Sequence, residues 1–166
     1  MKRFALSFSI CLLLLAVGAN TVSSATAPAV TVQFVNPAKF TDFSIHGRDA
    51  NYTAGVFSNS VKDELTPVLR QKYPNSSLVL RFTDVDLAGR YTTGRNARII
   101  GTAHPARMKF EFRLTDSSGR VLANGDTRLV DSSSLASSKN DPRRSQAFYY
   151  ERRLLNRWLR TLSVRK

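Results

Sequence analysis

A stretch of alternating apolar and charged residues from Arg107 to Val130 constrains the fold of this chain more than any other feature. Apolar side chains occupy every second position of its first half: Met108, Phe110, Phe112 and Leu114. Successive side chains of a strand point to opposite faces, so the pattern predicts a strand with one buried and one solvent-facing side. Gly119 supplies the dihedral freedom of a tight turn, after which a second strand returns to Val130. The stretch therefore predicts a β-hairpin that needs a cover on its apolar side.

The remaining periodicity predicts two helices and several strands. Apolar residues recur at helical spacing over about 54–73, where Pro67 predicts a kink or a break, and again over about 145–162. Shorter alternating runs predict further strands at 30–34, 78–83 and 97–100. Two amphipathic helices must bury their apolar stripes, and the apolar side of an antiparallel sheet can receive them. We therefore expect a two-layer α+β domain with a mainly antiparallel sheet and two helices packed on one face.

The beginning of the chain has the order of a secretory signal peptide. Lys2 and Arg3 precede an apolar run over 4–17, and small residues follow it. A membrane anchor is the alternative, but the run is short for a span of about 20 residues. We therefore expect a cleaved signal peptide at 1–25 and a single exported domain at 26–166, periplasmic or secreted, with no membrane span after cleavage.

The predicted exported part is strongly basic and has no thiol. The only cysteine, Cys11, lies within the signal peptide, so no disulfide is expected. The full chain has 25 Lys+Arg and 12 Asp+Glu, and removal of Lys2 and Arg3 leaves 23 − 12 = +11. Arginine suits carboxylate and phosphate partners, and a generally basic surface is the alternative reading. Because export separates the protein from nucleic acid, the predicted partners are an anionic envelope lipid, an anionic polymer or an acidic protein.

Cationic side chains in two regions form the predicted partner-binding site. On the second helix, Arg153, Arg157 and Arg160 follow i, i+4, i+7 spacing and share one face. Others belong to the solvent-facing side of the predicted sheet or to its end: Arg81, Arg90, Lys109 and Arg113. The leading hypothesis is a non-enzymatic binding or adaptor module. Polar segments at 91–97 and 131–146 lack a core pattern and predict loops, the second of them mobile.

Two carboxylates support an alternative hypothesis. Asp84 and Asp86 are two residues apart in a predicted strand, so both point the same way and could bind Ca²⁺ or Mg²⁺ in a metal-dependent hydrolase. Two carboxylates are too few without further oxygen ligands, and Arg90 offers a simpler ion-pair partner. His46 and His104 are isolated, and the chain has no nucleophile motif and no phosphate-binding glycine loop. We therefore predict no catalytic residue and no cofactor.

Four segments of the chain resemble one known family. They are VTVQFVNPAKFTD at 30–42, TDVDLAGR at 83–90, RMKFEFRLTDSSGRVLANGDTRLVD at 107–131 and YYERRLLNRWLR at 149–160. In this order they are similar to the small exported proteobacterial proteins grouped as domain of unknown function 3016. That family has no established activity. The resemblance implies export and a single domain, and it implies no catalytic residue.

Overall fold

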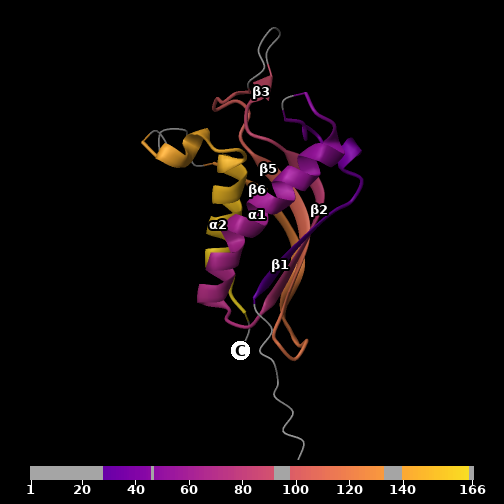
Figure 1. The fold of residues 1–166 in the computed structure, drawn as a ribbon, viewed down its shortest axis with the longest axis vertical. Helices are drawn as coiled ribbons and strands as arrows, with labels where there is room; N and C mark the ends of the chain where they lie inside the picture. Colours follow the sequence, from indigo (N-terminus) through magenta and orange to yellow (C-terminus); the bar gives the residue numbers. More distant parts are fainter. Residues whose placement is uncertain (1–27, 46, 92–97, 133–139, 165–166) are drawn as a thin grey trace, which may run out of the picture.

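The computed structural model describes residues 28–45, 47–91, 98–132 and 140–164 (Figure 1). The elements follow in the order β1 (Ala29–Phe34), η1 (Pro37–Lys39), α1 (Ala50–Lys72), β2 (Ser77–Asp86), β3 (Arg90–Tyr91), β4 (Arg98–Ile99), β5 (Arg107–Thr115), β6 (Val121–Val130), η3 (Pro142–Ser145) and α2 (Tyr149–Thr161). The predicted signal peptide, His46 and most of the predicted loop at 91–97 lie outside the described residues. So does the middle of the predicted mobile loop, whereas Asp131 at its start is buried and η3 forms near its end.

Four strands form the main sheet, in the order β1-β2-β5-β6. Strand β5 pairs antiparallel with both β2 and β6, and β1 runs parallel to β2. The parallel pair arises because the connection between β1 and β2 contains α1, and parallel neighbours need such a crossover. The fold is α+β with a mainly antiparallel sheet, as the alternation predicted. Strands β3 and β4 pair separately, beyond the end of β2.

The hairpin forms because its first strand has alternating apolar and polar residues and its turn has residues suited to a tight reversal. Side chains of β5 alternate between exposed and buried or half-buried positions from Arg107 to Leu114. At the turn, Asp116 Oδ1 accepts hydrogen bonds from the backbone N–H groups of Ser118 at 2.9 Å and Arg120 at 3.0 Å. Gly119 adopts φ = 85°, a left-handed conformation that favours glycine. The turn thus closes with local hydrogen bonds, as is usual for Asp-initiated turns.

Both helix starts differ from the predicted positions. Helix α1 begins at Ala50 rather than Ala54, because the Asp49 side chain accepts the Tyr52 N–H at 2.8 Å and caps the first turn. Pro67 lies inside α1 without dividing it. Helix α2 begins at Tyr149, so the predicted start at 145 was wrong: Phe148 has φ = 55°, and the preceding residues form η3.

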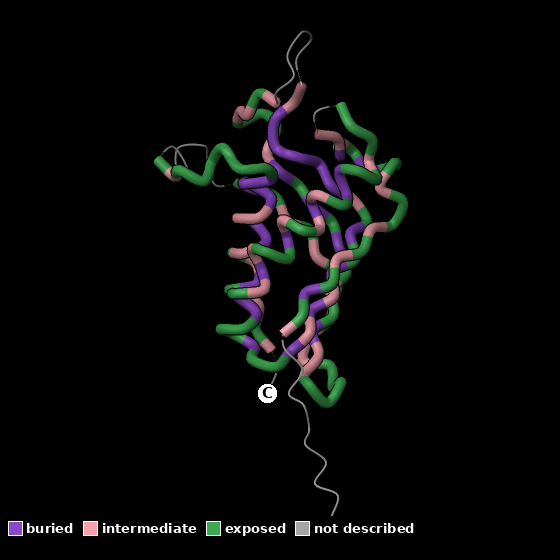
Figure 2. The backbone as a smooth tube through the Cα atoms, in the orientation of Figure 1, coloured by how far each residue is buried: buried purple, intermediate pink, exposed green. Residues whose placement is uncertain are grey.

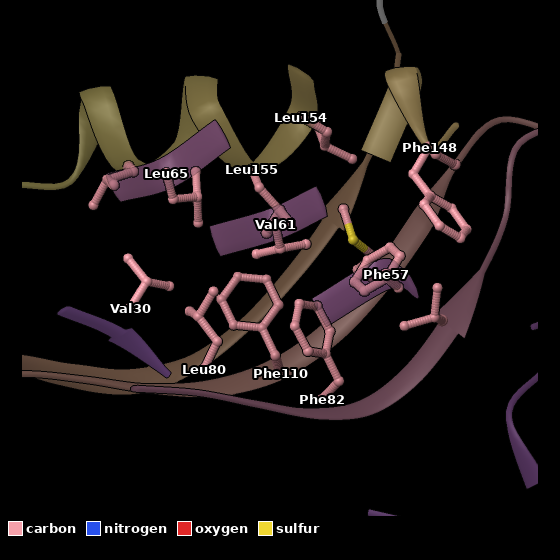
Figure 3. Packing of buried hydrophobic residues seen from close by; sticks show 14 of the residues in the cluster. Val30, Phe57, Val61, Leu65, Leu80, Phe82, Phe110, Phe148, Leu154 and Leu155 are labelled. Carbon is pink, nitrogen blue, oxygen red and sulfur yellow. The ribbon is translucent and has the colours of Figure 1, made fainter. Parts of the chain in front are cut away.

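The two helices cover one face of the main sheet (Figure 1). Buried positions concentrate between the helices and the sheet, and the hairpin turn is exposed (Figure 2). In this layer Phe57 of α1 points toward Phe82, while Phe110 and Leu80 of the sheet point toward the helical layer (Figure 3). Trp158 of α2 packs edge-on against the rings of Phe110 and Phe112, at centroid distances of 5.0 and 5.1 Å. Within the described ranges no helix is both long and apolar enough to cross a membrane.

Candidate functional site

An arginine-rich groove of about 450 Å³ runs along α2. Its lining comes from α2, η3 and one residue of α1: Glu64, Arg143, Tyr149, Arg152, Arg153, Asn156, Arg157, Arg160 and Thr161. Five arginines therefore face the hollow together with a single carboxylate. The lining of the groove carries a clear excess of positive charge, so an anionic group is the ligand that it fits electrostatically.

Helical periodicity explains most of this groove, and the turn before α2 supplies the rest. Arg153, Arg157 and Arg160 were predicted to share one face, and all three line the hollow. Sequence reasoning missed Arg143 and Arg152. Arg152 lies four residues before Asn156, which also lines the groove, and residues at this spacing share one face of a helix. Helical spacing could therefore have identified it. Arg143 comes from η3, and no periodic pattern indicated where that short helix lies.

Two of the five arginines are held by carboxylates. Asp141 accepts from Arg143 Nη2 at 3.0 Å and from the Tyr149 hydroxyl at 2.9 Å. The Arg143 hydrogen bonds hold the pKa of Asp141 well below its usual range, so this carboxylate stays ionised. Asp131, which is buried, accepts from Arg157 Nη2 at 3.1 Å. These contacts fix the positions of the two guanidinium groups, and the carboxylates neutralise part of their positive charge.

Two other arginines of the groove contact neutral partners. Arg152 Nη2 donates to Gln146 Oε1 at 2.6 Å, and Arg160 Nε donates to Asn156 Oδ1 at 2.8 Å. Within the described part of the chain, Arg152 Nε is buried without a hydrogen-bond partner. Neutral acceptors orient a guanidinium group but do not cancel its charge. Arg152 and Arg160 therefore supply positive charge that a bound anion can use.

Three of the other predicted cations, Arg81, Lys109 and Arg113, lie on the opposite face of the sheet from the helices, so the two predicted surfaces do not merge. On that face Arg81 Nη1 contacts both carboxylate oxygens of Glu111 at 2.9 Å. Lys109 Nζ lies 3.9 Å from Asp84 Oδ2. Arg113 is exposed there. This outer sheet face thus has charges of both signs and is a weaker candidate for anion binding than the groove.

The carboxylates of the metal hypothesis are engaged by protein groups. Asp84 accepts from the backbone N–H and the hydroxyl of Thr41 at 2.9 and 3.0 Å. Asp86 is buried, and its oxygens lie 2.9 Å from Arg90 Nη2 and 3.7 Å from Arg107 Nη1. Among the described residues, no group of three or more His, Cys, Asp and Glu side chains is placed to hold a metal ion. The predicted cation Arg90 is half-buried and is paired with Asp86 and Asp42.

Arg98 links the segment before α1 to the segment after β2, and sequence reasoning did not identify it. Its guanidinium contacts both oxygens of Asp42, at 3.1 and 2.7 Å. It also donates to the backbone carbonyls of Ser44, Leu87, Ala88 and Gly89. Close to this network, Gly89 has φ = 74°, and a Cβ there would lie 2.4 Å from the Ile99 carbonyl oxygen. The segment after β2 therefore requires glycine at this position, and Arg98 binds the backbone carbonyls around it.

Glu151 joins α2 to the same segment. Its side chain is buried, and Oε1 accepts the Ala88 N–H at 2.7 Å. Burial raises the pKa of Glu151, and the Ala88 hydrogen bond acts against that rise without cancelling it. The folded protein therefore holds the Glu151 proton more tightly than the unfolded chain does.

Glu151→Gln should make the protein more stable than the wild type at neutral pH, by an amount that grows as pH rises. A carboxyl whose folded pKa is raised stabilises the fold fully below its unfolded pKa of about 4.3, and this stabilisation is lost as pH rises through the folded pKa. Each unit of elevation contributes about 1.4 kcal/mol. Urea denaturation of both proteins between pH 4 and pH 8 measures the difference.

Leu154→Met is the matched control for this prediction, because it changes a buried residue of the same helix without changing a titratable group. Its stability difference from the wild type should be constant over the pH range. Parallel curves for Glu151→Gln and the wild type would contradict a raised pKa at Glu151.

The fold and the groove define an α+β domain with a cationic hollow on its C-terminal helix. The chain matches the family model described as protein of unknown function (DUF3016) over residues 28–161 and belongs to that family. All four segments that carried the resemblance lie inside the matched range, so the predicted family is confirmed. A search of curated proteins found no match.

Proposed function

We propose that this protein is an exported, non-enzymatic binding or adaptor module whose α2 groove engages an anionic component of the cell envelope or an acidic partner protein. One observation supports this above all: five arginines and a single glutamate line one groove. Guanidinium groups form planar, paired hydrogen bonds with phosphate and carboxylate oxygens. An anionic headgroup, a polyanion or an acidic peptide offers such oxygens.

The arginines of the groove have different parts in this proposal. Arg143 and Arg157 are held in place by Asp141 and Asp131 and give the groove a fixed geometry. Arg152 and Arg160, whose partners are neutral, provide the charge that attracts the ligand. The groove would bind as a preorganised surface, because its side chains already make hydrogen bonds before a ligand arrives.

Export belongs to the same proposal. The segment at 1–25 has the charge and hydropathy order of a signal peptide, and its removal leaves a net charge of +11. Outside the cytosol the abundant anions are lipid headgroups, acidic polymers and acidic protein surfaces. A cationic groove on a small exported domain suits contact with one of these.

The double change Arg153→Glu with Arg160→Glu should weaken binding of polyphosphate and of anionic lipid vesicles by at least about tenfold, because two attractive charges become repulsive. Isothermal titration at low salt measures the affinity for polyphosphate, and vesicle co-sedimentation measures the lipid interaction. Binding by the wild type should weaken as salt rises, because exposed charges are screened.

Lys62→Glu with Arg70→Glu is the control, since it changes net charge equally on the exposed side of α1. This variant should keep most of the affinity. Equal losses in both variants would show that overall charge, and not the groove, determines binding. Salt-independent binding in the wild type would contradict the proposal as well.

A further inference from the structure

The outer edge of β6 is unpaired in the described part of the chain. Strand β6 is last in the order β1-β2-β5-β6 and pairs with β5 alone. It is ten residues long and has no proline. Edge strands of this length offer backbone hydrogen-bonding groups to another strand, and proteins usually shorten, bend or cover them.

The backbone groups of β6 that point outward can be identified from its register. The N–H of Asp131 donates to the Ala106 carbonyl at 2.9 Å, so these opposed residues form a hydrogen-bonded pair. Hydrogen-bonded and non-hydrogen-bonded pairs alternate along an antiparallel ladder. The outward N–H and C=O groups therefore belong to alternate residues of β6: Asn124, Asp126, Arg128 and Val130.

Two charged residues of this strand each face a like charge of β5 that already has an ion-pair partner on β2. Asp126 lies opposite Glu111 of β5, and Arg128 lies opposite Lys109. Both are non-hydrogen-bonded positions, where side chains of an antiparallel pair are closest, and like charges there are destabilising. Asp126 and Arg128 are exposed, and neither has an ion-pair partner within 4 Å among the described residues. An external partner with alternating charge would satisfy both.

We propose that this partner is a second copy of the chain, whose β6 pairs antiparallel with β6 of the first around a two-fold axis at Thr127. In this register Asp126 lies opposite Arg128 of the second copy, and Asn124 lies opposite its Val130. All four outward-pointing residues then exchange hydrogen bonds with outward-pointing residues of the other strand. The two main sheets become one sheet of eight strands.

Charge selects this register over its neighbours. If the two-fold axis lies at Asp126, Asp126 of one copy lies opposite Asp126 of the other. If the axis lies at Arg128, the two copies of Arg128 lie opposite each other. Both arrangements put like charges directly across the new strand pair. The geometry also keeps the helices of both copies on the same side of the sheet, because opposed residues of an antiparallel pair share a face. A long polyanion could then reach two arginine grooves.

Sedimentation velocity of the purified protein over a range of concentrations tests the proposal. The wild type should dimerise. Asp126→Arg and Arg128→Asp should each weaken self-association at least about tenfold, because each places like charges across the new strand pair. Both variants should keep the fold, which circular dichroism can check. Asp126→Arg places a positive charge opposite Glu111 of β5, and Arg128→Asp places a negative charge opposite Lys109, so both changes are favourable within the chain.

Charge complementation makes the test specific. An equimolar mixture of the two variants should form a heterodimer, because a strand with two positive charges then lies against a strand with two negative charges. The double reversal should dimerise like the wild type. Arg113→Asp, on β5 and away from the edge, should not change association. A wild type that stays monomeric at all concentrations, or a mixture of folded variants that does not associate, would overturn the proposal.

Discussion

Replacing Phe57 by alanine should lower the free energy of unfolding by about 3–5 kcal/mol, the usual loss for a large aromatic side chain in a core. Phe57 is fully buried, and its ring lies within 5.0–6.2 Å, centroid to centroid, of Phe34, Phe43, Phe82 and Phe148. These partners come from the sheet, the segment before α1 and the start of α2. The substitution therefore leaves a cavity where strands β1 and β2, helix α1 and the start of α2 meet.

Urea denaturation followed by Trp158 fluorescence measures this effect, because Trp158 packs on the same sheet face. Domains of this size have a total stability of about 5–15 kcal/mol, so the Phe57 variant should lose a large fraction of its stability. Asn59→Ala, at an exposed position of the same helix, should stay within about 0.5 kcal/mol of the wild type. A loss below about 1 kcal/mol at Phe57 would show that the neighbouring rings collapse into the space.

The elements with strong periodicity were predictable from sequence. Strands β5 and β6 flank an Asp-Ser-Ser-Gly turn, and the alternation of β5 and the turn residues point to the same hairpin. The start of α1 was predicted less well, because its first turn is polar and the capping residue Asp49 is the only local signal. The parallel pairing of β1 was not predictable, since alternation identifies a strand but not its neighbour or its direction.

The candidate site was also predictable only in part. The i, i+4, i+7 spacing of Arg153, Arg157 and Arg160 identified one side of the groove, because helical geometry alone places those residues together. The second contributor, Arg143, reaches the groove through a turn whose geometry depends on Asp141. Hydrogen bonds from Arg143 and Tyr149 to Asp141 decide that position, and helical periodicity does not record them.

Arg98→Met should lower the free energy of unfolding by about 3 kcal/mol or more, although no pattern in the sequence distinguishes this arginine from the others. Its side chain is 11% exposed and forms a two-pronged ion pair with Asp42, fifty-six positions earlier in the chain. Removal leaves the Ala88 and Ser44 carbonyls without their Arg98 donor. Asp42 keeps its ion pair with Arg90 at 3.1 Å, so most of the cost comes from the backbone carbonyls that lose a charged donor.

Arg98→Lys separates the role of charge from the role of geometry. A lysine keeps the positive charge, but its single nitrogen cannot contact both Asp42 oxygens and the carbonyls around Gly89 together. It should therefore recover less than half of the stability lost in Arg98→Met. Arg113→Met, at an exposed position, should change stability by less than about 0.5 kcal/mol. Full recovery by lysine would show that charge alone holds the segments around Asp42 and Gly89 together, and that the planar fork of arginine contributes nothing there.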